Sequence, residues 1–393
     1  MAFNAEPTAI PTAIANRSGR IPELDGLRGI AIVLVVYYHC FFNNLTARKG
    51  SIASVLLASG RLSWTGVDLF FLLSGFLIGG ILIDARDSPN YFKTFYARRA
   101  LRIVPLYTVD CALTLAGFLL WRRAAHTSAS VDALFLGTLP WYTYVLFLQN
   151  FWMVHRDILW GGILTVTWSL AVEEQFYLTL PLLIRHVRIR SLDWLLPTAI
   201  AIVPFLRTII FLNYRHGVAA VHWLMPCHAD ALLLGVLCTV LFRNPSGWER
   251  VKTYKTLLWW LLVLLILGVM VLTAGIAPNL DSLFFNSVGY TWMALFYTCI
   301  LLLALSDPKN FLIKLLRFSG LRWLGSIAYG VYLFHVTVLE LCQILLRGRI
   351  EGIGSIESFG TVVLSVALTL AICAASWKYF ELPLLKRGHA FNY

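Results

Sequence analysis

The chain carries few charged residues for its length. Asp, Glu, Lys and Arg make up 13% of its 393 residues, whereas 59% are hydrophobic. Soluble domains carry about 25% charged residues, so the composition excludes an ordinary soluble protein. Apolar stretches such as 256–276 and 360–377 reach the roughly 20 residues that a membrane-spanning helix needs, and alternating barrel strands are absent. The sequence predicts an all-α polytopic membrane protein.

Several motifs are missing as well. The seven cysteines are scattered through apolar segments without a CxxC pair, so we expect small core residues rather than disulfides or ligands. No HExxH, GxSxG or P-loop is present. Cys227, His228 and Asp230 lie together in "MPCHADALLLG", but no second cluster completes a zinc site. We therefore expect no metal and no permanently bound cofactor.

Acidic residues are scarcer than basic ones. The chain has 20 Asp and Glu against 32 Lys and Arg, which leaves a net charge of +12. In a membrane protein such an excess is typical of basic residues retained on cytoplasmic loops, and we expect no nucleic-acid partner. Residues 1–22 begin with a Pro- and Ala-rich stretch that lacks the apolar core of a signal peptide, so they are interpreted as a flexible cytoplasmic tail.

The apolar pattern predicts ten spanning helices and one further segment. The helices are expected near 28–45, 64–84, 102–121, 166–184, 194–213, 228–243, 256–276, 285–306, 323–346 and 359–379. Segment 133–152 is long enough to cross, but Pro140 interrupts it. If it does not cross, the basic clusters at 86–102, 185–190, 243–255, 309–322 and 378–387 share one side. We therefore expect 133–152 to be re-entrant or interfacial and both termini to be cytoplasmic.

The basic residues at 48–49, 61, 122–123, 347 and 349 fall on the opposite side, so this rule works only as a majority. The membrane domain is expected to cover 23–388, followed by a short tail at 389–393. "LLSGFLIGG" (72–80) is interpreted as small-residue helix packing. Trp64 and Trp160 are interpreted as residues of the interfacial aromatic belt.

Ionisable side chains interrupt some of the apolar segments, and such residues usually mark function because charges are costly in lipid. The conspicuous ones are His39, Asp68, Glu173, Glu174 and His335. Arg28 precedes His39 by eleven residues, which is about 16 Å of helix and places His39 beyond the membrane midpoint. The predicted topology brings two imidazoles and at least two carboxylates to a similar depth. Glu173 and Glu174 lie about 100° apart on a helix, so both cannot face one site.

These residue types favour a particular chemistry. A neutral imidazole oriented by a carboxylate can take a proton from a hydroxyl near neutral pH. Arg98, Arg99 and Arg102 in "FYARRALRIVPLY" lie at the mouth of a predicted helix, where they can anchor the helix or bind phosphates. A long ligand with phosphates at the cytoplasmic side and a reactive end in the membrane suits both groups. Coenzyme A thioesters have that shape.

Seven motifs in order make the chain resemble the acyltransferase-3 family of integral membrane O-acyltransferases. They are "ELDGLRGIAIVLVVYYHC", "GVDLFFLLSGFLI", "FYARRALRIVPLY", "TWSLAVEEQFYL", "HADALLLG", "IAYGVYLFH" and "SWKYFELPLLK", and they run from Glu23 to Lys386. The resemblance implies a ten-helix bacterial inner-membrane enzyme that moves an acyl group, often acetyl, from cytoplasmic acyl-CoA. The acceptor is implied to be a hydroxyl of a sugar, glycolipid or related molecule.

The resemblance also assigns site residues. The Arg-x10-His pattern falls on Arg28 and His39 and implies that His39 is the catalytic base, with Asp68 or Glu173 as its partner. Donor binding is implied for Arg99 and Arg102, which match an Arg-x-x-Arg pattern, together with Arg28 and Arg98. The Trp-Ser-Leu-x-x-Glu motif favours Glu173 over Glu174. The acceptor or supporting residues are expected to be Trp168, Ser169, His335 and Asp230.

Two departures from the family pattern and two alternative functions stay open. His228 stands where many relatives have Arg, and no esterase-like domain follows the membrane domain as in some members. The same machinery could acylate a macrolide-like or other non-sugar hydroxyl. A transporter that uses the His/Glu layer is an alternative of another class, although paired broken helices in two related halves are not visible.

Overall fold

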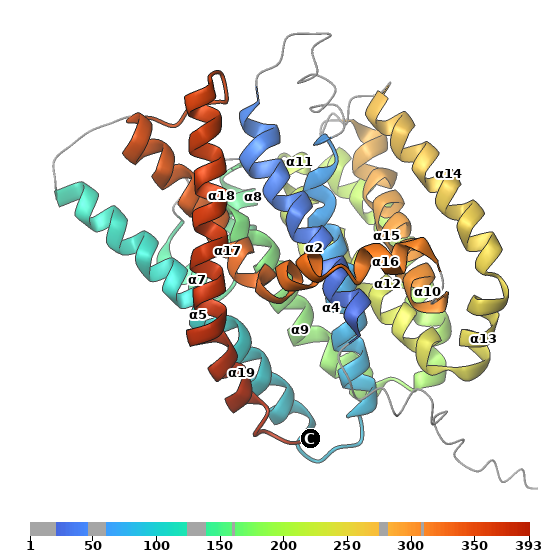
Figure 1. The fold of residues 1–393 in the computed structure, drawn as a ribbon. Coiled ribbons are helices and arrows are strands. Elements are labelled where there is room, and N and C mark those ends of the chain that lie inside the picture. The colour runs from blue at the N-terminus through green and yellow to red at the C-terminus, as the bar shows by residue number, and fades with distance from the viewer. Residues whose placement is uncertain (1–20, 46–59, 124–138, 159–161, 275–281, 308–309) are drawn as a thin grey trace, which may run out of the picture.

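The computed structural model describes residues 21–45, 60–123, 139–158, 162–274, 282–307 and 310–393. Within these ranges the regular structure is helical, with one isolated β-bridge between Leu45 and Ile353. The long helices are α2 (Pro22–Val36), α4 (Gly66–Asp84), α5 (Tyr91–Arg123), α9 (Trp168–His186), α10 (Ile189–Asn213), α12 (Met225–Arg243), α14 (Lys255–Ala274), α15 (Tyr290–Ser306), α17 (Ser319–Arg347) and α18 (Ile356–Ser376). They pack into one bundle (Figure 1), which confirms the all-α prediction.

Short elements connect or extend these helices. The short α-helices are α7 (Trp141–Val145), α8 (Gln149–His155), α11 (Gly217–Trp223), α13 (Pro245–Thr253), α16 (Phe311–Leu316) and α19 (Leu382–Gly388). Three π-helical segments are η1 (Tyr37–Phe41), η5 (Phe285–Gly289) and η6 (Trp377–Glu381), and three 3₁₀ turns are η2 (Phe42–Asn44), η3 (Ser63–Thr65) and η4 (Ile163–Thr167). Thus η1 continues α2 and η6 joins α18 to α19.

The number of membrane spans is close to the ten predicted. By length and hydropathy, eight helical segments in the described residues could span a membrane, or nine if the bent pair α13 and α14 forms one span. Helix α9 has 19 residues but does not pass this test. Its consecutive Glu173, Glu174 and Gln175 lower its mean hydropathy, because they are polar side chains within the helix.

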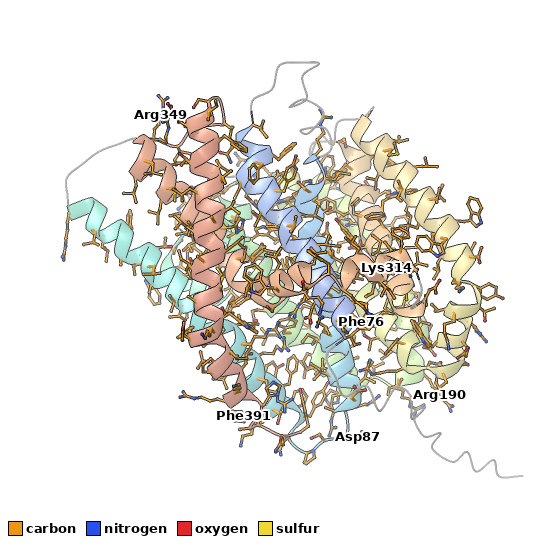
Figure 2. All side chains as sticks on the ribbon, in the orientation of Figure 1. Phe76, Asp87, Arg190, Lys314, Arg349 and Phe391 are labelled. Carbon is orange, nitrogen blue, oxygen red and sulfur yellow. The ribbon has the colours of Figure 1, made fainter. Side chains whose placement is uncertain are left out.

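Contacts at the helix ends show that the bundle has two distinct ends. Figure 2 shows Asp87, Arg190 and Phe391 at one end and Arg349 at the other. At the Phe391 end, Arg243, the last residue of α12, pairs with Asp84, the last residue of α4, at 2.6 Å. At the Arg349 end, the bridge between Leu45 and Ile353 joins the segments that follow α2 and α17. Helices α4 and α18 run between these two ends, whereas α17 lies partly across the other helices (Figure 1).

The described part of segment 133–152 does not cross the bundle. Its helices α7 and α8 have five and seven residues. The Gln149 side chain donates to the Thr167 carbonyl at 2.9 Å, and Asn150 donates to the Trp223 carbonyl at 3.2 Å. Both acceptors precede helices that run towards the Phe391 end, so this segment stays at the Arg349 end. Residues 139–152 thus form no spanning helix, as a re-entrant or interfacial segment requires.

Helix α5 differs most from its predicted bounds. It begins at Tyr91 rather than near 102. The prediction missed residues 91–101 because they are too polar for a hydropathy criterion, although they form regular helix. Arg98, Arg99 and Arg102 therefore lie within the helix and not at its mouth, which corrects the sequence interpretation. Their directions then follow the helical period: Arg99 and Arg102 are three residues apart and share a face.

Glycines bring α4 and α12 into close contact. A Cβ added at Gly75 would lie 1.9 Å from the Leu232 carbonyl oxygen, and one added at Gly235 would lie 2.1 Å from the Leu72 carbonyl oxygen. No side chain fits at either position without moving the neighbouring backbone, so the interpretation of "LLSGFLIGG" as a packing motif is confirmed. All seven cysteines are free and six are buried, as expected for core residues.

Candidate active site in two cavities

The larger of two cavities contains three arginines. It has a volume of about 570 Å³ and is lined by Arg28 of α2 and by Arg99 and Arg102 of α5. Among the described residues, no hydrogen bond or ion pair holds any of these three guanidinium groups. His389 also lines this cavity, two residues before Phe391, so the cavity lies towards the Phe391 end. We call it the inner cavity.

Two carboxylates of the inner cavity, Glu173 and Glu381, accept hydrogen bonds from hydroxyl groups. Glu173 accepts hydrogen bonds from Ser74 at 2.7 Å and from Tyr177 at 2.9 Å. Glu381 accepts one from Ser376 at 3.1 Å. Because these acceptors are engaged by hydroxyl donors, the three guanidinium groups keep their forked donors for a ligand. Glu173 lines the cavity and Glu174 does not, in agreement with the choice that the motif favours.

Arg98, which was predicted to bind the donor, is directed away from the inner cavity. Its guanidinium donates to the Phe391 carbonyl at 3.0 and 2.6 Å and lies 5.0 Å from the centre of the Tyr393 ring. It does not line the inner cavity. Arg98 therefore anchors the C-terminal residues to α5, whereas Arg99 lies against the ring of Tyr177, 5.9 Å from its centre.

The smaller cavity has a different lining. Its volume is about 220 Å³, and His39 and Glu340 contribute its ionisable side chains together with His222. Ile350, next to Arg349, also lines it, which places it towards the Arg349 end. We call it the outer cavity. Its remaining polar and aromatic walls come from Tyr38, Asn43, Asn44, Trp64, Thr165, Trp168, Trp223, Tyr332 and Gln343.

The tautomer of His39 follows from its hydrogen bond. His39 lies in the π-helical segment η1, an irregularity that often occurs at functional sites. Its Nδ1 is 3.0 Å from the Val35 carbonyl oxygen, which can only accept, so Nδ1 carries the hydrogen. The lone pair of Nε2 is then available as a base. The Val35 carbonyl thus orients His39, where a carboxylate was expected.

His335 lies beside His39. The two ring centres are 4.9 Å apart at an interplanar angle of 67°. Nδ1 of His335 is 2.8 Å from the Tyr332 carbonyl oxygen and 3.0 Å from that of Val331, so its Nε2 also carries a lone pair. This Nε2 is buried without a hydrogen-bond partner. The predicted proximity of the two imidazoles is therefore present in the structure.

The predicted carboxylate partners lie in other contacts. Asp68 is 3.4 Å from Nδ1 of His228, and the adjacent Asp230 pairs with the fully buried Arg207 at 2.8 Å. Thr291 donates to the same Asp230 oxygen at 2.6 Å. Neither Asp68 nor Asp230 lines a cavity. The single polar layer expected from helix depth is thus divided among a buried network, the inner cavity and the outer cavity.

Two side chains, Val67 and Tyr332, line both cavities. The hydroxyl of Tyr332 donates to the Val166 carbonyl at 2.8 Å and is hydrogen-bonded to the Ser169 hydroxyl. Trp168 lines the outer cavity and Ser169 lines the inner one. The Trp-Ser-Leu motif therefore lies at the partition between the cavities. A group bound in one cavity could reach a group bound in the other at this place.

Sequence reasoning missed three residues of this site. Glu340 is an ionisable residue within an apolar stretch, so the criterion that selected His335 could also have found it. Tyr332 gave no signal beyond an aromatic residue in an apolar helix. Trp64 was assigned to the interfacial belt, but it lines the outer cavity 5.6 Å from the ring of His222, which makes that assignment wrong. Trp160 lies outside the described residues.

The described residues contain no group of three His, Cys, Asp or Glu side chains placed to hold a metal ion. The cluster of Cys227, His228 and Asp230 is instead part of the buried network with Arg207, whose guanidinium donates to the Cys227 carbonyl at 3.1 Å. The described lining of the two cavities supplies imidazole, guanidinium, carboxylate and hydroxyl groups.

Comparisons with known proteins agree with this arrangement. The family model for the acyltransferase-3 domain, described as an acyltransferase domain, matches residues 21–378. The chain is 26% identical to the peptidoglycan O-acetyltransferase OatA of Listeria monocytogenes over 94% of its own length and 56% of the relative. It is 24% identical to the O-acetyltransferase OatA of Staphylococcus aureus, over 94% and 58% of the two chains.

A third relative is YrhL of Bacillus subtilis, whose assignment as a peptidoglycan O-acetyltransferase is provisional. It is 27% identical over 94% of this chain and 55% of its own length. The chain thus spans little more than half the length of the curated relatives that it matches. No solved structure matches it.

Proposed function

The chain belongs to the acyltransferase-3 family, and from that premise we propose that it transfers an acetyl group from acetyl-CoA to a sugar hydroxyl across the membrane. The observation that carries the proposal is the pair of cavities that meet at Val67 and Tyr332. One cavity offers guanidinium donors without partners, and the other offers a histidine with a free Nε2. A peptidoglycan-like sugar polymer is the acceptor class favoured by the relatives' names.

The inner cavity is proposed to take the donor. The phosphates of acyl-CoA suit the forked donors of Arg28, Arg99 and Arg102, because guanidinium groups bind phosphate in bidentate geometry. Glu173 then serves to hold Tyr177, whose ring lies beside Arg99. The thioester would extend along the cavity towards the partition at Tyr332. This places the donor on the Phe391 side, which the basic loops predict to be cytoplasmic.

The outer cavity is proposed to take the acceptor hydroxyl. Nε2 of His39 accepts the hydroxyl proton while the hydroxyl oxygen attacks the thioester carbonyl carbon. The new C–O bond forms and the C–S bond breaks, and the departing CoA thiolate takes the proton back from His39. His335 packs against His39 and limits the orientations of its ring. The catalytic step thus leaves both the enzyme and the proton count unchanged.

The test is acetyl transfer by the purified full chain in detergent, with labelled acetyl-CoA and a panel of sugar acceptors. His39→Ala should lower the transfer rate by about 10²- to 10⁴-fold, the usual contribution of a general base. The matched control is His186→Ala at the exposed end of α9, which should transfer normally.

Transfer that survives in His39→Ala would remove His39 from the catalytic role. CoA release that requires no acceptor in any condition would argue for a thioesterase. Movement of acetyl-CoA into liposomes without an acylated product would favour the transporter alternative.

A further inference from the structure

The outer cavity holds a carboxylate that the proposed mechanism does not use. Glu340 of α17 lines this cavity, and its Oε2 is buried without any hydrogen-bond partner. No ion pair or hydrogen bond to a described residue involves Glu340. A buried carboxylate oxygen without a partner loses the hydrogen bonds of water and gains nothing in return. Its position in a cavity means that a ligand can supply the missing donors.

The other residues that line the outer cavity restrict the chemical class of ligand that it can bind. None of the described residues that line the outer cavity is Lys or Arg, which contrasts with the three arginines of the inner cavity. A phosphate or carboxylate ligand would meet Glu340 without a compensating cation, so an anionic ligand is disfavoured. The ligand should therefore be rich in O–H or N–H donors.

The amide side chains of the cavity point to the same conclusion. The amide nitrogens of Asn44 and Gln343 are already engaged: Asn44 donates to the His39 carbonyl at 2.7 Å, and Gln343 donates to the Glu351 carbonyl at 2.9 Å. Asn44 also donates to the Cys40 carbonyl at 3.2 Å, so its carbonyl oxygen is the group that remains, whereas Gln343 keeps its carbonyl oxygen and one N–H. The cavity thus offers several acceptors to one ligand.

Aromatic rings supply the apolar part of the wall. Trp168 and Trp223 pack with ring centres 5.0 Å apart, and Trp64 lies 5.6 Å from the His222 ring. A pyranose ring has hydroxyl donors around its edge and C–H groups on its faces, so it matches a cavity with acceptors on one part and aromatic rings on another. A quaternary ammonium ion would match the rings and the carboxylate but would leave the amide oxygens unused.

We propose that the outer cavity is the acceptor subsite and binds one sugar residue, with Glu340 accepting hydrogen bonds from its hydroxyl or N–H groups. The inference rests on the proposed function for the identity of the reaction but not for the binding itself. Glu340 is a specificity-determining residue in this assignment: it binds the acceptor, and it does not move the proton that passes to His39.

The experiment measures sugar binding and acetyl transfer separately. The probe is the N-acetylglucosamine tetramer, titrated into the purified full chain and followed by tryptophan fluorescence, since three tryptophans line the cavity. Glu340→Gln keeps the shape of the side chain but replaces one acceptor oxygen by a donor. It should weaken binding by about tenfold, the usual effect of losing a side-chain hydrogen bond.

The matched control is Glu357→Gln, which removes an exposed carboxylate near the same end and should leave binding unchanged. Glu340→Asp keeps the charge and should recover part of the affinity. In transfer assays Glu340→Gln should raise the KM for the sugar and leave the KM for acetyl-CoA as in the wild type. General unfolding would not change one KM value without the other.

Outcomes separate this inference from the proposed function. Wild-type transfer with an unchanged sugar KM in Glu340→Gln would overturn the inference and leave the function intact. Sugar binding that depends on Glu340 in a chain without transferase activity would support the subsite and overturn the function. Tetramethylammonium bound in preference to the sugar would overturn the inference in favour of a cation site.

Discussion

The two cavities share a wall but have opposite chemistry. The inner cavity is larger, about 570 Å³ against 220 Å³, and three arginines without partners line it. The described lining of the outer cavity has aromatic walls, amide groups and one carboxylate without a partner among these residues, and it contains no Lys or Arg. Helices α4, α9 and α17 contribute to both, whereas α2 lines the inner cavity and its continuation η1 lines the outer one. The guanidinium groups favour an anionic ligand at the inner end, and the hydrogen-bond acceptors favour a neutral, hydroxyl-rich ligand at the outer end.

The largest change expected within this comparison comes from the arginines. Arg99→Gln and Arg102→Gln should each raise the KM for acetyl-CoA by about 10- to 100-fold, since a hydrogen bond to a charged group contributes roughly 1.5–3 kcal/mol. Neither change should alter the KM for the sugar, which would be measured in the same steady-state assay.

Arg98→Gln is the internal control, because Arg98 bonds to the Phe391 carbonyl and does not line the inner cavity. Equal losses of donor affinity in Arg98→Gln and Arg99→Gln would show that the arginines act through overall charge. That result would contradict the view that specific guanidinium groups of the inner cavity, and not a generally basic surface, bind the donor.

An intermediate effect is expected where α4 and α12 touch. Gly75→Ala places a Cβ 1.9 Å from the Leu232 carbonyl oxygen and should destabilise the protein by about 1–3 kcal/mol or more, as overpacking does. Because α4 lines both cavities through Val67, donor and acceptor binding should weaken together. Thermal unfolding in detergent and the two KM values would measure this.

Gly360→Ala is the matched change in α18, where an added Cβ meets no atom within 4 Å. It should stabilise the helix by roughly 0.5–1 kcal/mol, because Ala loses less backbone entropy than Gly. A Gly75→Ala variant as stable as Gly360→Ala would contradict the close contact between α4 and α12.

The smallest effect is expected at the rim of the outer cavity. Hydrogen bonds from Arg347 and Arg349 hold the pKa of Glu351 below its ordinary value of 4.5. A carboxylate with a depressed folded pKa stabilises the fold above its unfolded pKa and loses that contribution as the pH falls through the folded value. The melting temperature of the wild type should therefore fall slightly more than that of Glu351→Gln on acidification below about pH 4.5.

Parallel melting curves for the two proteins across that range would exclude a role for these ion pairs. Since the Glu351 carbonyl accepts from Gln343, a residue of the outer cavity, a loss of sugar affinity over the same pH range would link the rim to the acceptor subsite. The inner cavity, at the opposite end, should show no matching change in donor affinity.

Several features could be predicted from the sequence because they depend on local composition. Apolar stretches of sufficient length identified the long helices, and basic loops indicated that 133–152 stays on one side. The cost of charge in lipid identified His39, His335 and Glu173 as residues of interest, and all three lie in or beside a cavity. The criterion works because lipid penalises a buried charge wherever it occurs.

The contacts of those residues could not be predicted in the same way. Helix depth placed Asp68 and Glu173 level with His39, but depth does not determine the direction in which a side chain points. Asp68 faces His228, and Glu173 faces Ser74 and Tyr177. Similarly, hydropathy could not show that α5 begins at Tyr91, because its first turns are helical without being apolar.

The sequence by itself thus determined the helical membrane fold, the likeness to a family of acyltransferases and the residue types available for chemistry. Only the tertiary structure decided which side chains meet: that Arg99 faces a cavity and Arg98 faces Phe391, and that His39 is oriented by the Val35 carbonyl. The physical reason is that the rotation of each helix is set by close packing with distant segments, as at Gly75 and Leu232. Hydropathy and charge determine which stretches of the chain form helices and how these are oriented, whereas packing determines the direction in which each residue faces.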